Sequence, residues 1–170
     1  MSRRQRKTGR ILNIDKARFQ RRTHGRVYDA RIAWVSLALG SQKLGFNVTV
    51  VPPGKRAFPH HAHYANEEMF YVLEGGGSVR IGRRTFPIRQ GDFISLPVGP
   101  EWAHQIINTS AAPLRYLAVS TMEPTDVALY PDSKKLGVYA GSPPGRGDVK
   151  GALRHYTRLQ DGVDYWRDES

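Results

Sequence analysis

The sequence predicts an all-β fold, a sandwich or barrel that closes as a jelly roll. After Gly45, short runs of β-branched and aromatic residues follow one another at close, even spacing, each bounded by Pro, Gly or Asn. No long helical period interrupts these runs. We expect a jelly roll because that closure leaves few exposed strand edges.

The expected strands begin at FNVTVV and continue through a histidine-rich segment into MFYVLEG. SVRI and TFPI then flank a hairpin with Gly82 at its tip, and DFISL, AHQIIN and LRYLAVS follow. We place the barrel core at about 45–121 and a C-terminal wrap at 122–170. Within the wrap we expect a mobile loop at 142–147, and we expect Tyr165 and Trp166 to dock on the barrel wall.

The chain before the barrel divides into a basic arm and an apolar segment. Residues 1–26 carry a net charge of +9, out of +11 for the whole chain, and we expect this arm to be at least partly disordered. A nucleic-acid tail, an organelle transit peptide and a solvated leader all fit the charge; the scarcity of serine disfavours the transit peptide, and we favour the leader. Residues 27–170 form one predicted domain. Periodicity alone allows Arg31 to Leu39 to be a helix or a strand, and we favour a covered strand with Trp34 in the core.

Composition sets the class of protein. The 170 residues are enough to bury a core without stabilisation by disulfides or a structural metal. The absence of cysteine excludes disulfides and thiolate metal sites. No apolar run approaches the length of a membrane span, and the N-terminus has no hydrophobic signal segment. We therefore expect a soluble, cytoplasmic protein.

Four metal-ligating side chains gather in two segments. His61 and His63 lie two residues apart, so on an extended strand they share one face at roughly 6–7 Å from each other. Glu68 follows five residues later, and His104 lies in the second segment, from Gly91 to Asn108. Three imidazoles and a carboxylate suit a divalent transition metal.

These two segments resemble the two motifs of the cupin superfamily. The first motif is matched by Gly54, His61, His63, Glu68 and Gly75, with one more residue than usual before His61. The second is matched by Gly91, Pro97, Gly99, His104 and Asn108, with four residues between Gly99 and His104. The resemblance covers about a third of the chain. It implies a double-stranded β-helix with His61, His63, Glu68 and His104 as metal ligands, and a homodimer built through sheet faces or N-terminal strands.

Residues near the predicted ligands are candidates for the pocket lining. Alternation from Glu68 and His104 points Phe70 and Ile106 inward, while Phe58 and Trp102 are close in sequence to ligands. Alternation also points His60 and Glu67 away from the metal, although a register shifted by one residue would make Glu67 the ligand in place of Glu68.

Function stays open between two classes. The first is a metalloenzyme of dioxygenase, isomerase or decarboxylase type that acts on a small oxygen-rich molecule, and the second is a ligand-binding or regulatory module without catalysis. The ion is one of Mn, Fe, Ni or Zn, because mixed nitrogen and oxygen ligands suit all of them. The sequence gives no second constellation that would name a general base.

Overall fold

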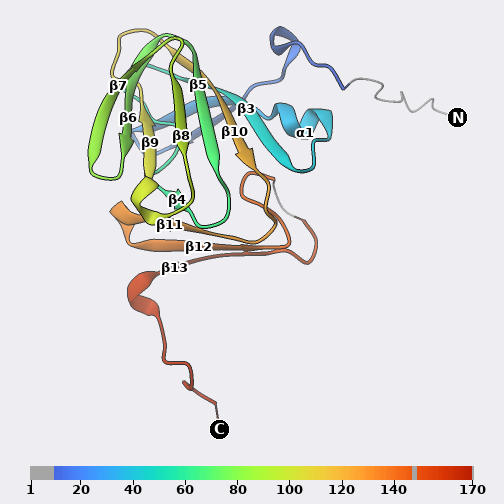
Figure 1. The fold of residues 1–170 in the computed structure, drawn as a ribbon, viewed down its shortest axis with the longest axis vertical. Helices are drawn as coiled ribbons and strands as arrows, with labels where there is room; N and C mark the ends of the chain where they lie inside the picture. The colour runs from blue at the N-terminus through green and yellow to red at the C-terminus, as the bar shows by residue number, and fades with distance from the viewer. Residues whose placement is uncertain (1–9, 147–148, 170) are drawn as a thin grey trace, which may run out of the picture.

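Three β-sheets make up most of the structure, a computed structural model that describes residues 10–146 and 149–169 (Figure 1). The six-stranded sheet contains, in spatial order, β1 (Gln20–His24), β2 (Tyr28–Ala33), β3 (Leu44–Val51), β10 (Leu114–Thr121), β5 (Glu68–Glu74) and β8 (Phe93–Leu96). The three-stranded sheet contains β7 (Arg84–Arg89), β6 (Gly76–Ile81) and β9 (His104–Ile107). The four-stranded sheet contains β13 (Leu153–Arg158), β12 (Lys135–Ala140), β11 (Asp126–Tyr130) and β4 (Ala62–His63).

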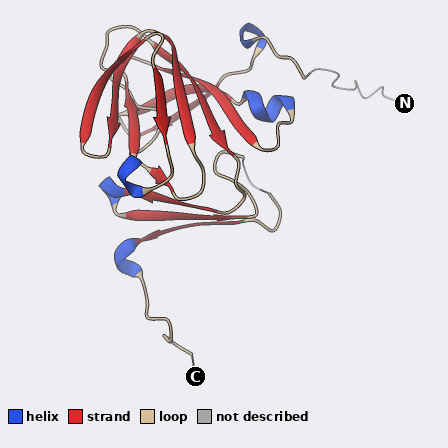
Figure 2. Cartoon of the chain, in the orientation of Figure 1, coloured by secondary structure: helices blue, strands red, loops and turns tan. Residues whose placement is uncertain are grey.

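Helices are short and lie between the strands (Figure 2). They are α1 (Val35–Leu39) and the 3-10 turns η1 (Ile14–Lys16), η2 (Pro100–Trp102), η3 (Pro131–Ser133) and η4 (Leu159–Asp161). No helix of the described chain has the length and apolar character needed to cross a bilayer. The structure therefore confirms the all-β, jelly-roll prediction.

The core lies between the six-stranded and three-stranded sheets. Alternation along β10 turns Leu114, Tyr116 and Ala118 inward, and they pack in one cluster with Val79 and Ile106 from the facing sheet. This inward and outward alternation is the packing expected of two β layers.

The segment Arg31 to Leu39 is not a single strand, and that prediction was wrong. The strand ends at Ala33, and Val35–Leu39 forms α1, which Gly40 ends in the left-handed region at φ 72°. Glycine adopts this conformation at little cost, and its N–H reaches the carbonyls of Leu37 and Ser36. Leucine and alanine favour a helix, so the SLALG stretch outweighed the alternation. Trp34 is partly buried and packs against the core.

The loop at 142–147 is packed rather than loose over its described residues, 142–146; residue 147 lies outside them. Ser142 is buried, and Gly145 lies beside the Trp34 ring. Arg146 donates to Gln42 Oε1 at 3.1 Å and approaches the Ser41 carbonyl at 3.4 Å. The expectation of a mobile loop overlooked this guanidinium, whose donors fix the loop to the turn after α1.

The C-terminal end does not dock on the barrel, contrary to the prediction. Tyr165 is 84% exposed and Trp166 71% exposed, and the two rings pack on each other at 4.8 Å. The tail leads away from the four-stranded sheet (Figure 1). Aromatic content alone was a poor guide, because both rings stay largely exposed in the described part of the chain.

The N-terminal arm enters the fold earlier than the division at residue 26 suggested. Residues 1–9 lie outside the described residues. Residues 20–24 form β1, whose register with β2 pairs Gln20 with Ile32 and His24 with Tyr28. The proposed boundary therefore falls inside a hairpin, and the second half of the basic arm belongs to the six-stranded sheet.

Candidate metal centre

A backbone bridge brings the two histidine segments together. His61 and His104 exchange both backbone hydrogen bonds, with His104 N to His61 O at 2.7 Å and His61 N to His104 O at 3.1 Å. Their rings are consequently 4.7 Å apart. The neighbouring Asn108 is fully buried and donates to the carbonyls of Val51 and Ala112, so this motif residue fixes the loop and is not a ligand.

Glu68 is the point on which the three imidazoles converge. It opens β5, and its Oε2 atom lies 2.9 Å from His104 Nε2, 3.7 Å from His63 Nε2 and 3.9 Å from His61 Nε2. Ligands about 2.1 Å from a shared ion lie about 3 Å apart at right angles and about 4 Å apart when opposite. The observed separations fall in this range.

Hydrogen bonds at the other ring nitrogen fix the tautomers. His61 Nδ1 is 2.8 Å from the Pro59 carbonyl, and His104 Nδ1 is 3.1 Å from the Trp102 carbonyl. A carbonyl only accepts, so both Nδ1 atoms carry a proton, and Nε2 is the atom that offers a lone pair when the ring is neutral. Both Nε2 atoms face the Glu68 carboxylate.

His63 is held by a carboxylate from the four-stranded sheet. Its Nδ1 donates to Asp126 Oδ2 at 2.6 Å. Asp126 is fully buried and also accepts from the Ala65 amide and the Asn66 side chain, at 2.9 Å each. Burial would raise the pKa of Asp126, but the bonds from His63 and Asn66 hold it below its usual value. A ring held by an anionic acceptor in this way is a stronger metal ligand.

Two buried atoms of the cluster lack hydrogen-bond partners among the described residues. They are Glu68 Oε2 and His104 Nε2, which are 2.9 Å apart without hydrogen-bond alignment. Burial, together with the charges of His104 and His63, lowers the pKa of His61 to about 3, so this ring is neutral. Burial alone would raise the pKa of Glu68, but His104 and His63 lower it to about 2, so the carboxylate is ionised. Both are the protonation states that a metal requires.

The structure therefore brings together all four predicted ligands: three form a tight group, and the fourth lies next to it. One ligand atom each of His61, Glu68 and His104 lies within 4.8 Å of the others. His63 adjoins this set through Glu68 at 3.7 Å. A donor set of imidazole nitrogens and a carboxylate fits a divalent transition metal.

Two residues next to the ligands also have defined places. His60 is not at the surface; it is 3% exposed, and its Nε2 lies 3.0 Å from the carbonyl of Ala103, the residue before His104. Glu67 is exposed, as alternation from Glu68 predicts.

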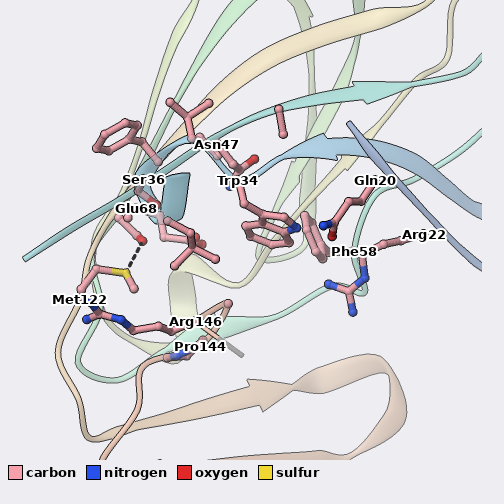
Figure 3. Close-up of a pocket in the computed structure, with 18 of the residues that line it drawn as sticks. Gln20, Arg22, Trp34, Ser36, Asn47, Phe58, Glu68, Met122, Pro144 and Arg146 are labelled. Atoms are coloured by element: carbon pink, nitrogen blue, oxygen red, sulfur yellow. Dashed lines mark hydrogen bonds between the residues drawn. The ribbon is translucent and has the colours of Figure 1, made fainter. Parts of the chain in front are cut away.

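A cavity of about 970 Å³ opens beside the cluster. It runs between the barrel, the N-terminal strands and the C-terminal wrap, and Figure 3 shows Trp34 and Phe58 between Arg22 and Arg146. Phe58 and Phe70 line it together with His61, His63 and Glu68, and the Phe70 ring is 5.4 Å from that of His104.

The other two residues proposed for the lining lie elsewhere. Ile106 is in the buried core, and Trp102 lies in η2 at 38% exposure. Sequence reasoning missed Asp126 and Tyr130, which β11 carries to the site. Their distance along the chain from the motifs left no spacing signal.

Comparison with known proteins finds one domain model and several similar proteins. A model described as a cupin domain matches residues 47–120. An uncharacterized protein of Methanocaldococcus jannaschii is 37% identical over 71 residues, which are 42% of this chain and 54% of that protein. The match thus spans about half of that curated relative.

Two solved structures resemble nearly the whole chain. One is a proposed sugar phosphate isomerase from Acidithiobacillus ferrooxidans, with a TM-score of 0.79 and 22% identity over 91% of this chain and 96% of that one. The other is a sugar phosphate isomerase from Silicibacter pomeroyi, with a TM-score of 0.74 and 22% identity over 89% and 94%. At this identity the likeness establishes the fold. The family-model match supports a cupin domain at residues 47–120 of this chain.

Proposed function

We propose that the chain binds one divalent transition-metal ion through His61, His63, Glu68 and His104, and that the adjoining cavity holds a small oxygen-rich molecule against it. The observation that carries this proposal is the convergence of three imidazole Nε2 atoms on one buried carboxylate oxygen. The His61 ring is neutral, so without a cation its Nε2 lone pair would face the carboxylate in a site shielded from water.

The residues of the chain supply holding and orientation. The carbonyls of Pro59 and Trp102 and the carboxylate of Asp126 fix the three rings, and Phe70 packs against His104. When bound, the ion would act as a Lewis acid toward an oxygen of the ligand. Four protein ligands leave positions open to such a molecule on a six-coordinate ion.

An isomerase is the enzyme class that we favour. Support comes from the two solved structures, whose names refer to sugar phosphate isomerases and whose fold matches nearly the whole chain. Isomerisation moves a proton between neighbouring carbons of a hydroxy-carbonyl compound, which is the kind of small molecule that a metal holds through two oxygens.

A binding module without catalysis is the second candidate. Among the described residues that line the cavity, Glu68 is the sole carboxylate, and it is already used as a ligand. A proton transfer from carbon needs a general base, and the lining offers no second acidic side chain for that role.

Reconstitution with Mn(II) or Fe(II) separates these functions. We expect a small diol or hydroxy acid to perturb the spectroscopic signal of the ion in the loaded protein, and Glu68→Ala to abolish the effect while the fold persists. Turnover of a sugar phosphate that is lost in Glu68→Ala establishes the enzyme. Saturable binding without turnover across the panel establishes the module, and failure of every oxygen ligand to reach the ion overturns both.

A further inference from the structure

Three tyrosine hydroxyls form a chain on the four-stranded sheet beside the metal centre. Tyr139 Oη lies 2.7 Å from Tyr156 Oη and 3.4 Å from Tyr130 Oη. Tyr139, in the middle, is 4% exposed, whereas Tyr156 is 51% exposed. The row of three hydroxyls therefore leads from solvent into the protein.

The fold builds this arrangement from three neighbouring strands. The register pairs Asp126 with Tyr139 between β11 and β12, and Gly137 with Tyr156 between β12 and β13. A Cβ at Gly137 would lie 2.9 Å from Tyr156 Cε1 and 3.3 Å from Tyr139 Cε2. The absence of a side chain at Gly137 thus allows the two tyrosine rings to meet.

The inner end of the hydroxyl chain adjoins the metal ligands. Asp126 and Tyr130 lie on the same face of β11 because they are four residues apart. Asp126 holds His63, and the Tyr130 ring stacks on His61 with centroids 5.9 Å apart and an interplanar angle of 18°. All three tyrosines line the cavity that contains His61, His63 and Glu68.

The chain of hydroxyls has one donor to spare. Three hydroxyls carry three hydrogens, and the two contacts between them use two. The third hydrogen remains free to donate to a ligand, from Tyr130 or from Tyr156 according to the direction of the hydrogen bonds.

Positive charge lies beside the tyrosine rings, where the Arg154 guanidinium is 5.7 Å from the centroid of Tyr139. Lys135 is 5.4 Å above the Tyr130 ring and makes no ion pair within the described part of the chain. The described lining of the cavity contains six Lys and Arg side chains against Glu68.

We propose that Tyr130, Tyr139 and Tyr156, with Lys135, form an oxyanion subsite that binds the phosphate or carboxylate group of a small ligand whose other oxygens face the metal centre. Hydroxyl donors and a nearby ammonium group are the partners that such a group needs when it leaves water. The inference rests on the proposed function in taking this cavity as the ligand site. It adds the charge of the ligand and the end of the cavity at which that charge lies.

Calorimetric titration of the full-length protein with its metal tests the subsite. The probes are glycerol 3-phosphate, glycerate and glycerol, which share a three-carbon skeleton and differ in their anionic group. We expect at least one anionic probe to bind about tenfold more tightly than glycerol, since a hydrogen bond to a charged group is worth about that factor. Tighter binding of glycerol 3-phosphate assigns a phosphate ester, and tighter binding of glycerate assigns a carboxylate.

Variants locate the effect. Tyr139→Phe and Tyr156→Phe keep the rings and remove hydroxyls, and Lys135→Gln removes the charge, so each should remove most of this roughly tenfold preference for the anion. Tyr64→Phe and Lys134→Gln are matched controls on side chains that do not line the cavity, and they should change nothing.

Metal content measured on the same samples separates the two proposals. Metal-bound protein that binds all three probes equally, or tyrosine variants that keep the full preference, would overturn the subsite. Protein that cannot be loaded with metal and still prefers the anion would support the subsite and contradict the proposed function.

Discussion

Asp126 binds His63 although it lies 63 residues later in the sequence. This separation along the chain explains why the ligands could be predicted and the residue that holds one of them could not. His61, His63, Glu68 and His104 were predicted as ligands because they lie in two short motifs with fixed spacing. Asp126 is one of many acidic residues, and only the pairing of β11 with β4 places it beside His63. Ring orientation likewise depends on carbonyl groups, which every residue carries.

The first prediction concerns this aspartate. Asp126→Asn should lower metal affinity about 10- to 100-fold, because the amide cannot hold the His63 ring as an anionic acceptor does. Competition with a chromophoric chelator measures the affinity. Asp161→Asn, an exposed aspartate in η4, serves as the control and should bind metal like the wild type. Equal affinity in the two variants would show that His63 is not a ligand.

At the scale of elements, regular alternation was a good guide and short irregular segments were not. The β6–β7 hairpin around Gly82 was predicted and is observed, since two strand-like runs flank a turn residue. The α1 helix was read as a strand, because five residues are too few for a helical period to show. The exposed tail was misplaced, because docking depends on a complementary surface that no local pattern reveals.

The β1–β2 hairpin gives a prediction about pH. Arg21 binds Asp29 in a bidentate contact, with Nε to Oδ1 at 3.0 Å and Nη2 to Oδ2 at 2.8 Å, and this bond lowers the pKa of Asp29. The folded state therefore binds the Asp29 proton less readily than the unfolded state does. The resulting stability is complete above the unfolded pKa of about 3.9 and is lost as the pH falls through the lower folded value.

Thermal unfolding across pH measures this effect. Asp29→Asn should be less stable than the wild type at neutral pH, and the gap should close as the pH falls below about 4. A gap that stays constant, or that widens in acid, would mean that the ion pair contributes nothing to the hairpin.

Removal of the tail gives a second prediction at this scale. Truncation after Gly162 removes Tyr165 and Trp166, which are 84% and 71% exposed, so the free energy of unfolding should change by no more than about 0.5 kcal/mol. Denaturant unfolding measures it. Arg146→Ala, which frees a packed loop, should destabilise the protein more. A large loss on truncation would show that the tail has a partner surface.

At the scale of the whole molecule, the barrel was predictable and the cavity was not. Motif spacing and strand alternation led to a cupin domain, and the match over residues 47–120 agrees. The cavity is built by three parts that lie far apart in the sequence, namely the N-terminal strands, the barrel and the C-terminal wrap. The sequence lacks a signal for such a space because its walls meet only after the chain has folded.

The homodimer stays a prediction for the whole molecule. Ile32 and Ala33 are buried within the single chain, so they need no cover from a second copy. Apolar side chains remain exposed on β13 and η4, at Leu153, Tyr156 and Leu159. Light scattering at tens of micromolar should give twice the mass of the chain; a monomer at this concentration would refute the dimer.

Deletion of residues 1–10 should leave metal content and ligand binding unchanged, because the segment has no apolar face to bury. Binding to nucleic acid that weakens with salt and disappears on deletion would instead give the arm a role.

Metal content by mass spectrometry tests directly whether the chain binds a transition-metal ion. The protein should be purified without added metal and without nickel resin. We expect about one transition-metal ion per chain in the wild type and in His60→Ala, whose ring bonds the backbone of Ala103, and severe loss in His61→Ala, Glu68→Ala and His104→Ala. Metal-free wild type that cannot be loaded would contradict the account, since the contact between His104 and Glu68 would then be a buried imidazolium–carboxylate pair. Equal loss in His60→Ala would contradict the assignment of ligands.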